Sequence, residues 1–128
     1  MVIDTSALAA IFFQEPERGS FRAALLTANT RLISAATVLD SGMVLEARRG
    51  EGAGREFDLF AMRALHIVAV DAEQAELARS AWRRYGKGRH PAGLNYGDCF
   101  VYALAKASGE PILAKGTEFA RTDVAIHS

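Results

Sequence analysis

The chain begins with Met1-Val-Ile-Asp4-Thr-Ser-Ala-Leu8, a short apolar run that ends in an acid and is followed at once by a helical pattern. Val2 and Ile3 are typical of a buried strand. Asp4 stands at the end of that strand, where an unpaired carboxylate is costly to bury. This stretch therefore predicts a strand and a helix joined at a carboxylate that needs a counter-charge.

Strand-like runs and helical patterns alternate through the rest of the chain. We expect strands over residues 2–3, 31–34, 66–70 and 111–114, with a short fifth candidate at 124–126. The helical patterns cover 6–13, 16–29, 34–49, 55–65, 71–85 and 95–108. Gly50, Gly52 and Gly54 predict the most flexible loop, and a second loop follows over 86–93.

Strands separated by helices predict right-handed crossovers, and hence an α/β fold with a mostly parallel sheet covered by helices on both faces. At 128 residues, without an internal repeat, the chain fits a single domain spanning 1–128. In such sheets the functional crevice lies outside the carboxyl ends of the strands. We therefore expect the functional residues at that edge.

Composition excludes several classes of protein. Half of the residues are hydrophobic, which excludes a disordered chain. The longest apolar run, residues 7–13, is too short to cross a bilayer, and no basic segment precedes it as in a signal peptide. Cys99 is the only cysteine, which excludes an internal disulfide and indicates a reducing compartment. We expect a cytoplasmic protein with no membrane partner.

The formal net charge is zero, but the basic side chains are unevenly distributed. Five of them, and no acid, lie between Arg79 and His90, whereas the rest of the chain carries 10 basic and 15 acidic side chains. Such a local concentration is a candidate phosphate-binding surface. A solvated helix face is the alternative, and spacing alone favours neither. We call this set the basic strip: Arg79, Arg83, Arg84, Lys87 and Arg89.

Several acids follow the expected strands. Asp4 ends the first strand, Asp40 lies just beyond the start of the helix after the second, and Asp98 lies in the first turn of its helix. Glu118 and Asp123 follow the fourth strand. Because these positions share one edge of a parallel sheet, we expect the acids to converge there.

Asp40 and Asp98 each occupy an otherwise apolar helix face, so we expect both to point inward. Asp40 shares its face with Ala36, Thr37, Met43, Val44 and Ala47. Asp98 shares its face with Leu94, Val101, Tyr102 and Ala105. No lysine or arginine occupies those positions. Two purely structural alternatives remain open, since Asp4 could cap the helix after it and Asp98 could stabilise a helix N-terminus.

Three inward-facing acids without a basic partner indicate a bound divalent cation. Oxygen ligands suit Mg²⁺, or Mn²⁺ as a substitute, rather than zinc. The histidines form no zinc-binding set, because His66 lies in a strand, His90 in a loop and His127 at the terminus. A carboxylate metal site beside a basic strip indicates phosphodiester hydrolysis, in which one or two ions activate a water.

Stretches along the whole chain resemble the PIN-domain ribonucleases, specifically the toxins of the VapBC toxin–antitoxin systems. These stretches are Met1–Leu8, Ile33–Asp40, Val44–Arg48, Ala81–Pro91, Leu94–Phe100, Lys115–Phe119 and Thr122–Asp123. The resemblance implies a three-layer α/β/α PIN-like domain and Mg²⁺-dependent endoribonuclease activity. It also implies a homodimer, and inhibition by a cognate antitoxin protein that covers the site.

Carried over residue by residue, the resemblance implies four catalytic acids: Asp4, Asp40, Asp98 and Glu118. Asp4 and Asp98 are expected to bind the metal. Ser6 or Thr5 is expected either to orient Asp4 or hold the metal-bound water, or only to cap the helix. Four members of the basic strip are expected to position the RNA backbone: Arg83, Arg84, Lys87 and Arg89.

The chain departs from the family pattern at two positions. The second acid of the family is usually glutamate, and Asp40 is shorter by one methylene, or about 1.5 Å. Two consecutive aspartates usually precede the position of Phe119, where this chain has Thr117 and Glu118. Asp123 is therefore a rival to Glu118 for the fourth acid.

Two other functions are compatible with these residues to different degrees. A PIN module whose site is weakened at Asp40 and Thr117 would bind RNA or a protein partner without cleaving RNA. A phosphotransfer or receiver-like protein would use Asp4 and Lys115, but Asp4-Thr5-Ser6 lacks the second acid of the Asp-x-Asp pattern. We therefore expect a ribonuclease, with the non-cleaving module as the alternative.

Overall fold

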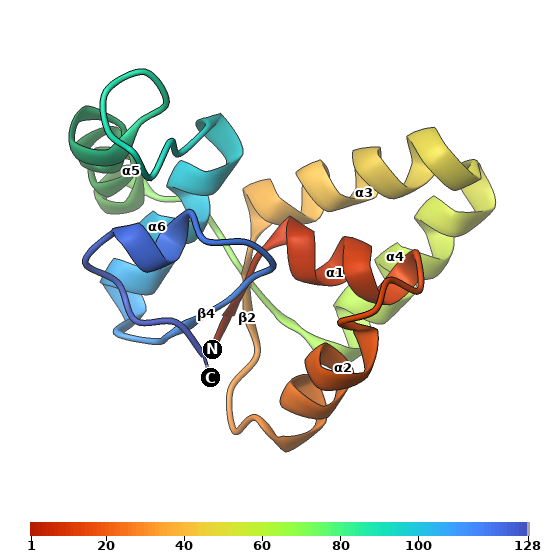
Figure 1. Cartoon of the computed structure of the whole chain (residues 1–128). Helices are drawn as coiled ribbons and strands as arrows, with labels where there is room; N and C mark the ends of the chain where they lie inside the picture. Colours follow the sequence, from red (N-terminus) through yellow and green to blue (C-terminus); the bar gives the residue numbers. More distant parts are fainter. Residues whose placement is uncertain (128) are drawn as a thin grey trace.

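The computed structural model describes residues 1–127 (Figure 1). Its strands are β1 Val2–Ile3, β2 Leu32–Ser34, β3 His66–Val68 and β4 Ile112–Leu113. The helices of the first half are α1 Thr5–Phe12, α2 Arg18–Thr27, α3 Ala35–Arg49 and α4 Glu51–Ala64. The later helices are α5 Ala72–Tyr85, α6 Tyr96–Ser108 and the short 3₁₀ helix η1 Phe119–Arg121. None of the helices in this range is both long and apolar enough to cross a lipid bilayer.

The strands form one parallel sheet in the order β3-β2-β1-β4. Val2 of β1 pairs with Leu32 on one side and with Ile112 on the other. Strands from both ends of the chain are thus neighbours, with β1 in the centre of the sheet and β4 beside it at the end of the strand order. This arrangement confirms the predicted α/β fold with a parallel sheet.

Alternate residues of the strands enter two separate hydrophobic cores. Val2 and Ile112 pack with α5 and α6, whereas Ile3 and Leu113 pack with α1 to α4. This alternation follows from the pleat of a strand, in which successive side chains point to opposite faces. Figure 1 shows α5 and α6 on one side of the sheet and α1 to α4 on the other. The three-layer α/β/α architecture is therefore confirmed.

Side-chain caps start the helices at the predicted positions. Ser34 accepts a hydrogen bond from the backbone N–H of Ala36, and Asp71 accepts one from that of Gln74. Each cap satisfies a backbone donor that the first helical turn leaves unpaired. These contacts are local in sequence, which explains why the helix starts could be predicted.

The predicted flexible loop over Gly50, Gly52 and Gly54 is wrong. Only Gly50 breaks the helical path, with φ +88°, and α4 begins at the next residue instead of at Arg55. A Cβ atom at Gly54 would lie 2.7 Å from Oε1 of Glu46 on α3. Gly54 therefore permits close packing between α3 and α4.

Two other segments also differ from the prediction. The run 66–70 is paired only up to Val68, and β3 lies at the edge of the sheet with Ile67 38% exposed. An edge strand has a neighbour on one side only, so its β-branched side chains are less completely covered than predicted. The fifth candidate at 124–126 forms a single bridge between Ile126 and Ile112. Helix α2 starts at Arg18, two residues after Pro16.

Candidate active site

The four acids predicted to be catalytic come from four separate segments and lie near one another. Asp4 follows β1, Asp40 lies in α3, Asp98 in the first turn of α6, and Glu118 just before η1. Burial raises the pKa of the Asp98 carboxyl to about 6. Further upward contributions come from the charges of the three other acids, Asp4, Glu118 and Asp40. The predicted convergence of the acids is therefore present in the fold.

Asp4 is a buried carboxylate held by its own helix. It caps α1, and its Oδ2 accepts hydrogen bonds from the backbone N–H of Ser6 at 3.0 Å and from the Ser6 hydroxyl at 2.5 Å. The Ser6 hydroxyl accepts the backbone N–H of Lys115 at 2.8 Å, which ties Asp4 to the segment after β4. Burial raises the pKa of Asp4 although the Ser6 hydrogen bonds lower it. The capping alternative and the orienting role of Ser6 are both realised.

Asp98 is held in a reciprocal capping box at the start of α6. Its Oδ2 accepts the backbone N–H of Asn95 at 3.0 Å, and Asn95 Oδ1 accepts the backbone N–H of Asp98 at 2.9 Å. The other oxygen, Oδ1, has no hydrogen-bond partner within residues 1–127. The same holds for Oδ1 of Asp4 over that range. Each carboxylate is thus fixed through one oxygen while the second stays available.

Asp40 is exposed, so its predicted burial on an apolar helix face is wrong. The buried side of α3 carries Thr37, Ser41 and Leu45 instead. Asp40 nevertheless contributes to the acid cluster, because its Oδ2 accepts a 2.8 Å hydrogen bond from the Thr5 hydroxyl beside Asp4. Thr5 therefore orients the second acid, whereas Ser6 orients the first.

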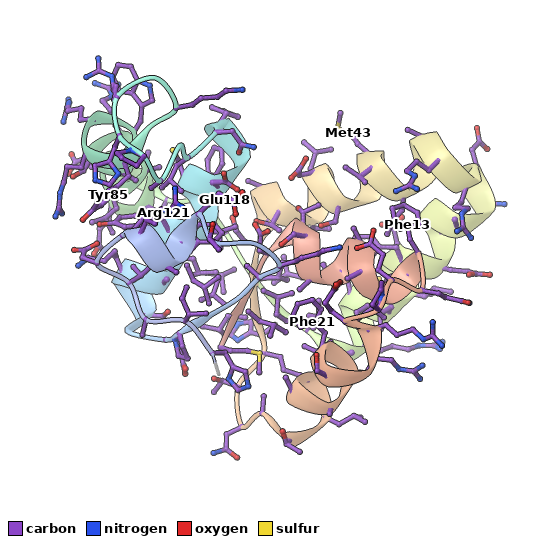
Figure 2. All side chains as sticks on the ribbon, in the orientation of Figure 1. Phe13, Phe21, Met43, Tyr85, Glu118 and Arg121 are labelled. Carbon is purple, nitrogen blue, oxygen red and sulfur yellow. The ribbon has the colours of Figure 1, made fainter. Side chains whose placement is uncertain are left out.

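Glu118 and Asp123, the two candidates for the fourth acid, have different surroundings. Asp123 is neutralised, since Oδ1 accepts the Tyr102 hydroxyl at 2.7 Å and Oδ2 lies 3.0 Å from Lys106 Nζ. Burial raises the pKa of Asp123, but these hydrogen bonds and the Lys106 charge outweigh it and lower the pKa overall. The negative charge of Glu118 instead helps to raise the pKa of Asp98. Figure 2 shows Glu118 between the start of α6 and the helices α1 and α3.

No lysine or arginine neutralises the cluster within the described residues. The ion pairs of residues 1–127 leave out Asp4, Asp40, Asp98 and Glu118. Lys115 is near in sequence to Glu118, but its Nζ binds Glu15 at 3.0 Å and Glu17 at 3.1 Å. The carboxylates therefore repel one another without a compensating charge from the chain, and a bound cation would relieve that repulsion.

The donor set fits a hydrated Mg²⁺ ion better than a fully caged metal. No three Asp, Glu, His or Cys side chains in residues 1–127 are arranged to hold one ion together. Mg²⁺ keeps several of its waters and usually binds proteins through one or two carboxylates. Asp4 and Asp98 each have one oxygen without a hydrogen-bond partner in residues 1–127, as such a pair would need.

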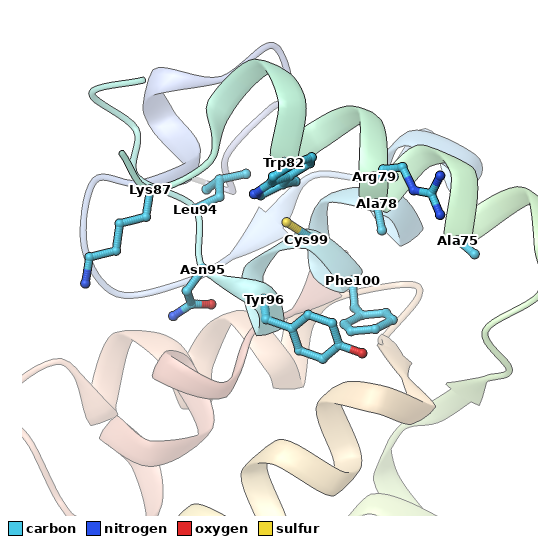
Figure 3. Close-up of a pocket in the computed structure, with 10 residues that line it drawn as sticks. All are labelled: Ala75, Ala78, Arg79, Trp82, Lys87, Leu94, Asn95, Tyr96, Cys99 and Phe100. Carbon is cyan, nitrogen blue, oxygen red and sulfur yellow. The ribbon is translucent and has the colours of Figure 1, made fainter. Parts of the chain in front are cut away.

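The basic strip is divided among different partners. Arg84 lies 3.5 Å from Asp123 and donates to the Tyr85 hydroxyl, so it turns away from the acids. Arg89 lies over the ring of Trp82, 4.1 Å from its centroid. Lys87 borders a pocket that also contains Asn95, the cap of α6 (Figure 3). Of these residues, Lys87 has the clearest connection to the acid cluster.

The sequence did not single out three further residues that shape the site. Ser41 donates its hydroxyl to Thr5 Oγ1 at 3.0 Å and so supports the contact to Asp40. A Cβ atom at Gly97 would lie 3.3 Å from Asp40 Oδ2, and one at Gly116 would lie 2.5 Å from Glu118 Oε2. Glycine at these two positions leaves room for the carboxylates. The positive φ of +99° at Gly116 is a backbone feature that sequence spacing does not reveal.

The family model and the most similar known proteins indicate the same family for this chain. The chain matches the PIN domain over residues 1–125. Ribonuclease VapC30 of Mycobacterium tuberculosis is 56% identical over 126 residues, which cover 98% of this chain and 96% of that protein. Ribonuclease VapC of Mycolicibacterium smegmatis is 57% identical over 126 residues, covering 98% of each chain.

Solved structures support the same fold. VapC20 of Mycobacterium tuberculosis, described as a Sarcin-Ricin loop cleaving toxin, matches with a TM-score of 0.78 at 18% identity over 97% of this chain and 95% of that one. A toxin-antitoxin complex from Klebsiella pneumoniae matches with a TM-score of 0.72 at 19% identity over 98% and 95% of the two chains. Together with the acid cluster, the family match and the relatives with more than half of their residues identical show that this chain belongs to the VapC ribonucleases of the PIN-domain family.

Proposed function

We propose that this protein is a metal-dependent endoribonuclease that hydrolyses RNA phosphodiester bonds, and that it is the toxin of a toxin–antitoxin pair. One observation carries the proposal: acids from four separate segments meet at one edge of the sheet without a basic partner in residues 1–127. Membership of the VapC ribonucleases supplies the substrate class. RNA is the substrate, and its backbone phosphate is the reacting group.

VapC ribonucleases of the PIN family depend on divalent metal ions as a class, and we propose Mg²⁺ here, with Mn²⁺ as a substitute. Asp4 and Asp98 would hold the ion through their free oxygens, while Asp40 and Glu118 would bind through water. Such an ion supplies a polarised phosphate and a water that is deprotonated near neutral pH. The acids that do not hold the ion directly would orient the attacking water and accept its proton.

The RNA backbone would be bound mainly by side chains that project from the basic strip. Lys87 is the first candidate, because it borders the pocket next to the cap of α6. Arg83 and Arg89 would add charge to the same surface, and Arg84 would add less because it pairs with Asp123. Contacts of this type give affinity for RNA without selecting its sequence. Ser6 would act through Asp4, whose Oδ2 it contacts.

An antitoxin protein is the proposed partner, since structural neighbours include a toxin-antitoxin complex. We also propose a homodimer of single-domain subunits spanning residues 1–128. The parallel sheet supports one domain, because it joins strands from both ends of the chain. The single free cysteine and the RNA substrate support a cytoplasmic location.

Cleavage of RNA by the purified protein, free of antitoxin, tests the proposal. We expect products in Mg²⁺ and in Mn²⁺, none in EDTA, and none from Asp98→Asn. Glu56→Gln is a suitable control, because Glu56 is an exposed acid of α4 outside the cluster. RNA that stays intact at high protein concentration in both metals would contradict the ribonuclease function.

The alternative is a PIN module that binds RNA or a partner without cleaving RNA. It is favoured by the exposure of Asp40 and by the lack of three acids arranged to hold one ion within residues 1–127. The alternative predicts RNA binding that needs no metal and persists in Asp98→Asn. It also predicts that Asp40→Glu, which restores the family's longer acid, tightens metal binding and creates or raises cleavage.

A further inference from the structure

A pocket of about 540 Å³ lies between α5 and α6 (Figure 3). Its volume falls in the range of roughly 300–1,000 Å³ that is typical of ligand sites. Asn95 connects it to the cluster, because Asn95 lines the pocket and also caps the helix that carries Asp98. The other lining residues are mostly apolar: Ala75, Ala78, Arg79, Trp82, Lys87, Leu94, Tyr96, Cys99 and Phe100.

Aromatic side chains line this pocket although they are open to solvent. Trp82 is 46% exposed and Tyr96 is 82% exposed. The Tyr96 ring meets the Phe100 ring edge-on, with 5.0 Å between their centroids. Exposed aromatic groups gathered in a hollow are typical of a binding surface.

Two neighbouring groups of the chain pack against the Trp82 ring. A Cβ atom at Gly86 would lie 2.9 Å from Trp82 Cδ1, so the absence of a side chain there lets the backbone lie against the indole. The guanidinium of Arg89 lies over the ring, 4.1 Å from its centroid. A fixed ring loses little freedom on binding, which favours stacking of a flat ligand.

The charge of the pocket rim identifies the kind of ligand. Arg79 and Lys87 are its charged lining residues, and none of the described lining residues is acidic. The apolar aromatic interior suits a flat ring, whereas the basic rim suits an anion attached to it. A nucleotide within an RNA strand combines both, since every base has a π-face and every linkage carries a phosphate.

We propose that this pocket is a nucleobase-binding subsite, in which one unpaired base of the RNA stacks on Trp82. Lys87 and Arg79 contact the flanking phosphates, and the strand passes Asn95 into the acid cluster. The subsite rests on the proposed ribonuclease function. A base can enter it only when it is unpaired, so the protein selects single-stranded segments or loops of RNA.

Binding measurements with an abasic scan test the subsite. Asp98→Asn protein is used so that the RNA stays intact. The probes are short fluorescent single-stranded oligoribonucleotides in which one nucleotide at a time lacks its base, and affinity is read by fluorescence anisotropy. We expect Kd to rise about 10-fold at one position and little elsewhere, as for the loss of one base stack.

Variants of Trp82 separate the contribution of the RNA base to affinity from that of the RNA backbone. Adding Trp82→Ala should raise Kd for the unmodified RNA by a similar factor and remove the response to the abasic position. Trp82→Phe, which keeps a ring, should retain that response and shows whether the pocket still folds. A flat scan, an abasic response that persists in Trp82→Ala, or no binding to any probe would overturn the subsite.

Lys87→Ala tests the phosphate contact. We expect Lys87→Ala to weaken the binding of intact and of abasic RNA by the same factor. The slope of log K against log salt concentration should become smaller by about 1. Arg55→Ala is the matched control, because Arg55 is an exposed cation of α4 and should leave both quantities unchanged. If Trp82→Ala instead changes only the self-association of the protein in sedimentation, the pocket is a contact between two copies and the subsite is wrong.

Cleavage and binding distinguish failure of the subsite from failure of the proposed function. RNA cleavage by the wild type together with a flat abasic scan would overturn the subsite and leave the ribonuclease intact. A Kd that depends on the base, together with wild-type protein that leaves RNA uncleaved, would support the subsite and overturn the ribonuclease function.

Discussion

The Thr5 hydroxyl donates a 2.8 Å hydrogen bond to Oδ2 of Asp40, which links the first turn of α1 to α3 across 35 residues of sequence. Thr5 Oγ1 in turn accepts the hydroxyl of buried Ser41 at 3.0 Å. Asp40 is exposed, so this chain of hydroxyls replaces burial as the means of fixing its direction. The acid that departs from the family pattern is therefore oriented by neighbours on two helices.

Thr5→Val removes the hydroxyl while keeping the shape of the side chain. We expect the cleavage rate or the Mg²⁺ affinity to fall about 10- to 100-fold, the usual loss when a carboxylate at a metal site loses its orienting partner. Thr5→Ser keeps the donor and should retain most of the activity. Initial rates on a fluorescent RNA, measured over a series of Mg²⁺ concentrations, provide the comparison. An equal loss in both variants would show that the hydroxyl is not what matters.

The raised pKa of Asp98 makes the stability of the metal-free protein depend on pH. Its pKa of about 6 lies above the ordinary 3.8, so the folded state holds this proton more tightly than the unfolded chain. The stabilising effect is complete below 3.8 and is lost as the pH rises through about 6. In EDTA, we expect the free energy of unfolding to decrease with rising pH over this window, and to decrease less in Asp98→Asn.

Urea unfolding of both proteins at a series of pH values measures this difference. Saturating Mg²⁺ near neutral pH should stabilise the wild type more than Asp98→Asn, because a metal binds the ionised carboxylate of the folded state. Parallel stability curves for the two proteins would argue against a half-buried Asp98 without a neutralising cation.

The roles of Glu118 and Asp123 can be distinguished by whether substitution lowers the stability of the protein or its cleavage rate. Asp123→Ala leaves the hydroxyl of buried Tyr102 without its acceptor and frees Lys106, so it should cost roughly 1–3 kcal/mol of stability and leave cleavage unchanged. Glu118→Ala removes an exposed acid and should lower cleavage with little change in stability. Thermal unfolding and initial cleavage rates on both variants are sufficient. The opposite pattern would make Asp123 the fourth acid.

Gly116→Ala tests the room left for Glu118. The new Cβ would lie 2.5 Å from Glu118 Oε2, and the φ of +99° is strained for alanine. Gly109 is the matched control, because its φ is also positive, at +73°, and an added Cβ atom there would meet no neighbouring group within 4 Å. We expect both alanine variants to lose about 1 kcal/mol of stability. Only Gly116→Ala should also lose cleavage, because its methyl group displaces the carboxylate; equal cleavage by the two variants would contradict this role.

Local signals make much of the fold predictable. The strand and acid at Val2 to Asp4, and the helix starts at Ser34, Asp71 and Asn95, depend on contacts within a few residues of sequence. The alternation of strands and helices then favours a parallel sheet. The acids can be placed at one edge because they follow strand ends, although that placement does not reveal how each side chain points.

Features that depend on long-range packing are not predictable in the same way. The glycines after α3 indicate a loop, yet Gly54 is helical and lies against Glu46 of the neighbouring helix. The helical pattern predicts a buried Asp40, but the packed side of α3 is the one that carries Ser41. Its position in the sequence places Arg84 with the predicted phosphate-binding residues. Its ion pair with Asp123, however, depends on how the last residues of the chain fold.

Anomalous diffraction from crystals grown in Mn²⁺ would show directly whether the acids share a cation. We expect a peak in contact with the carboxylate oxygens of Asp4 and Asp98, with Asp40 and Glu118 reaching the waters of the same ion. No peak among these acids at saturating Mn²⁺, or a peak only at other carboxylates, would contradict a metal centre at this edge of the sheet.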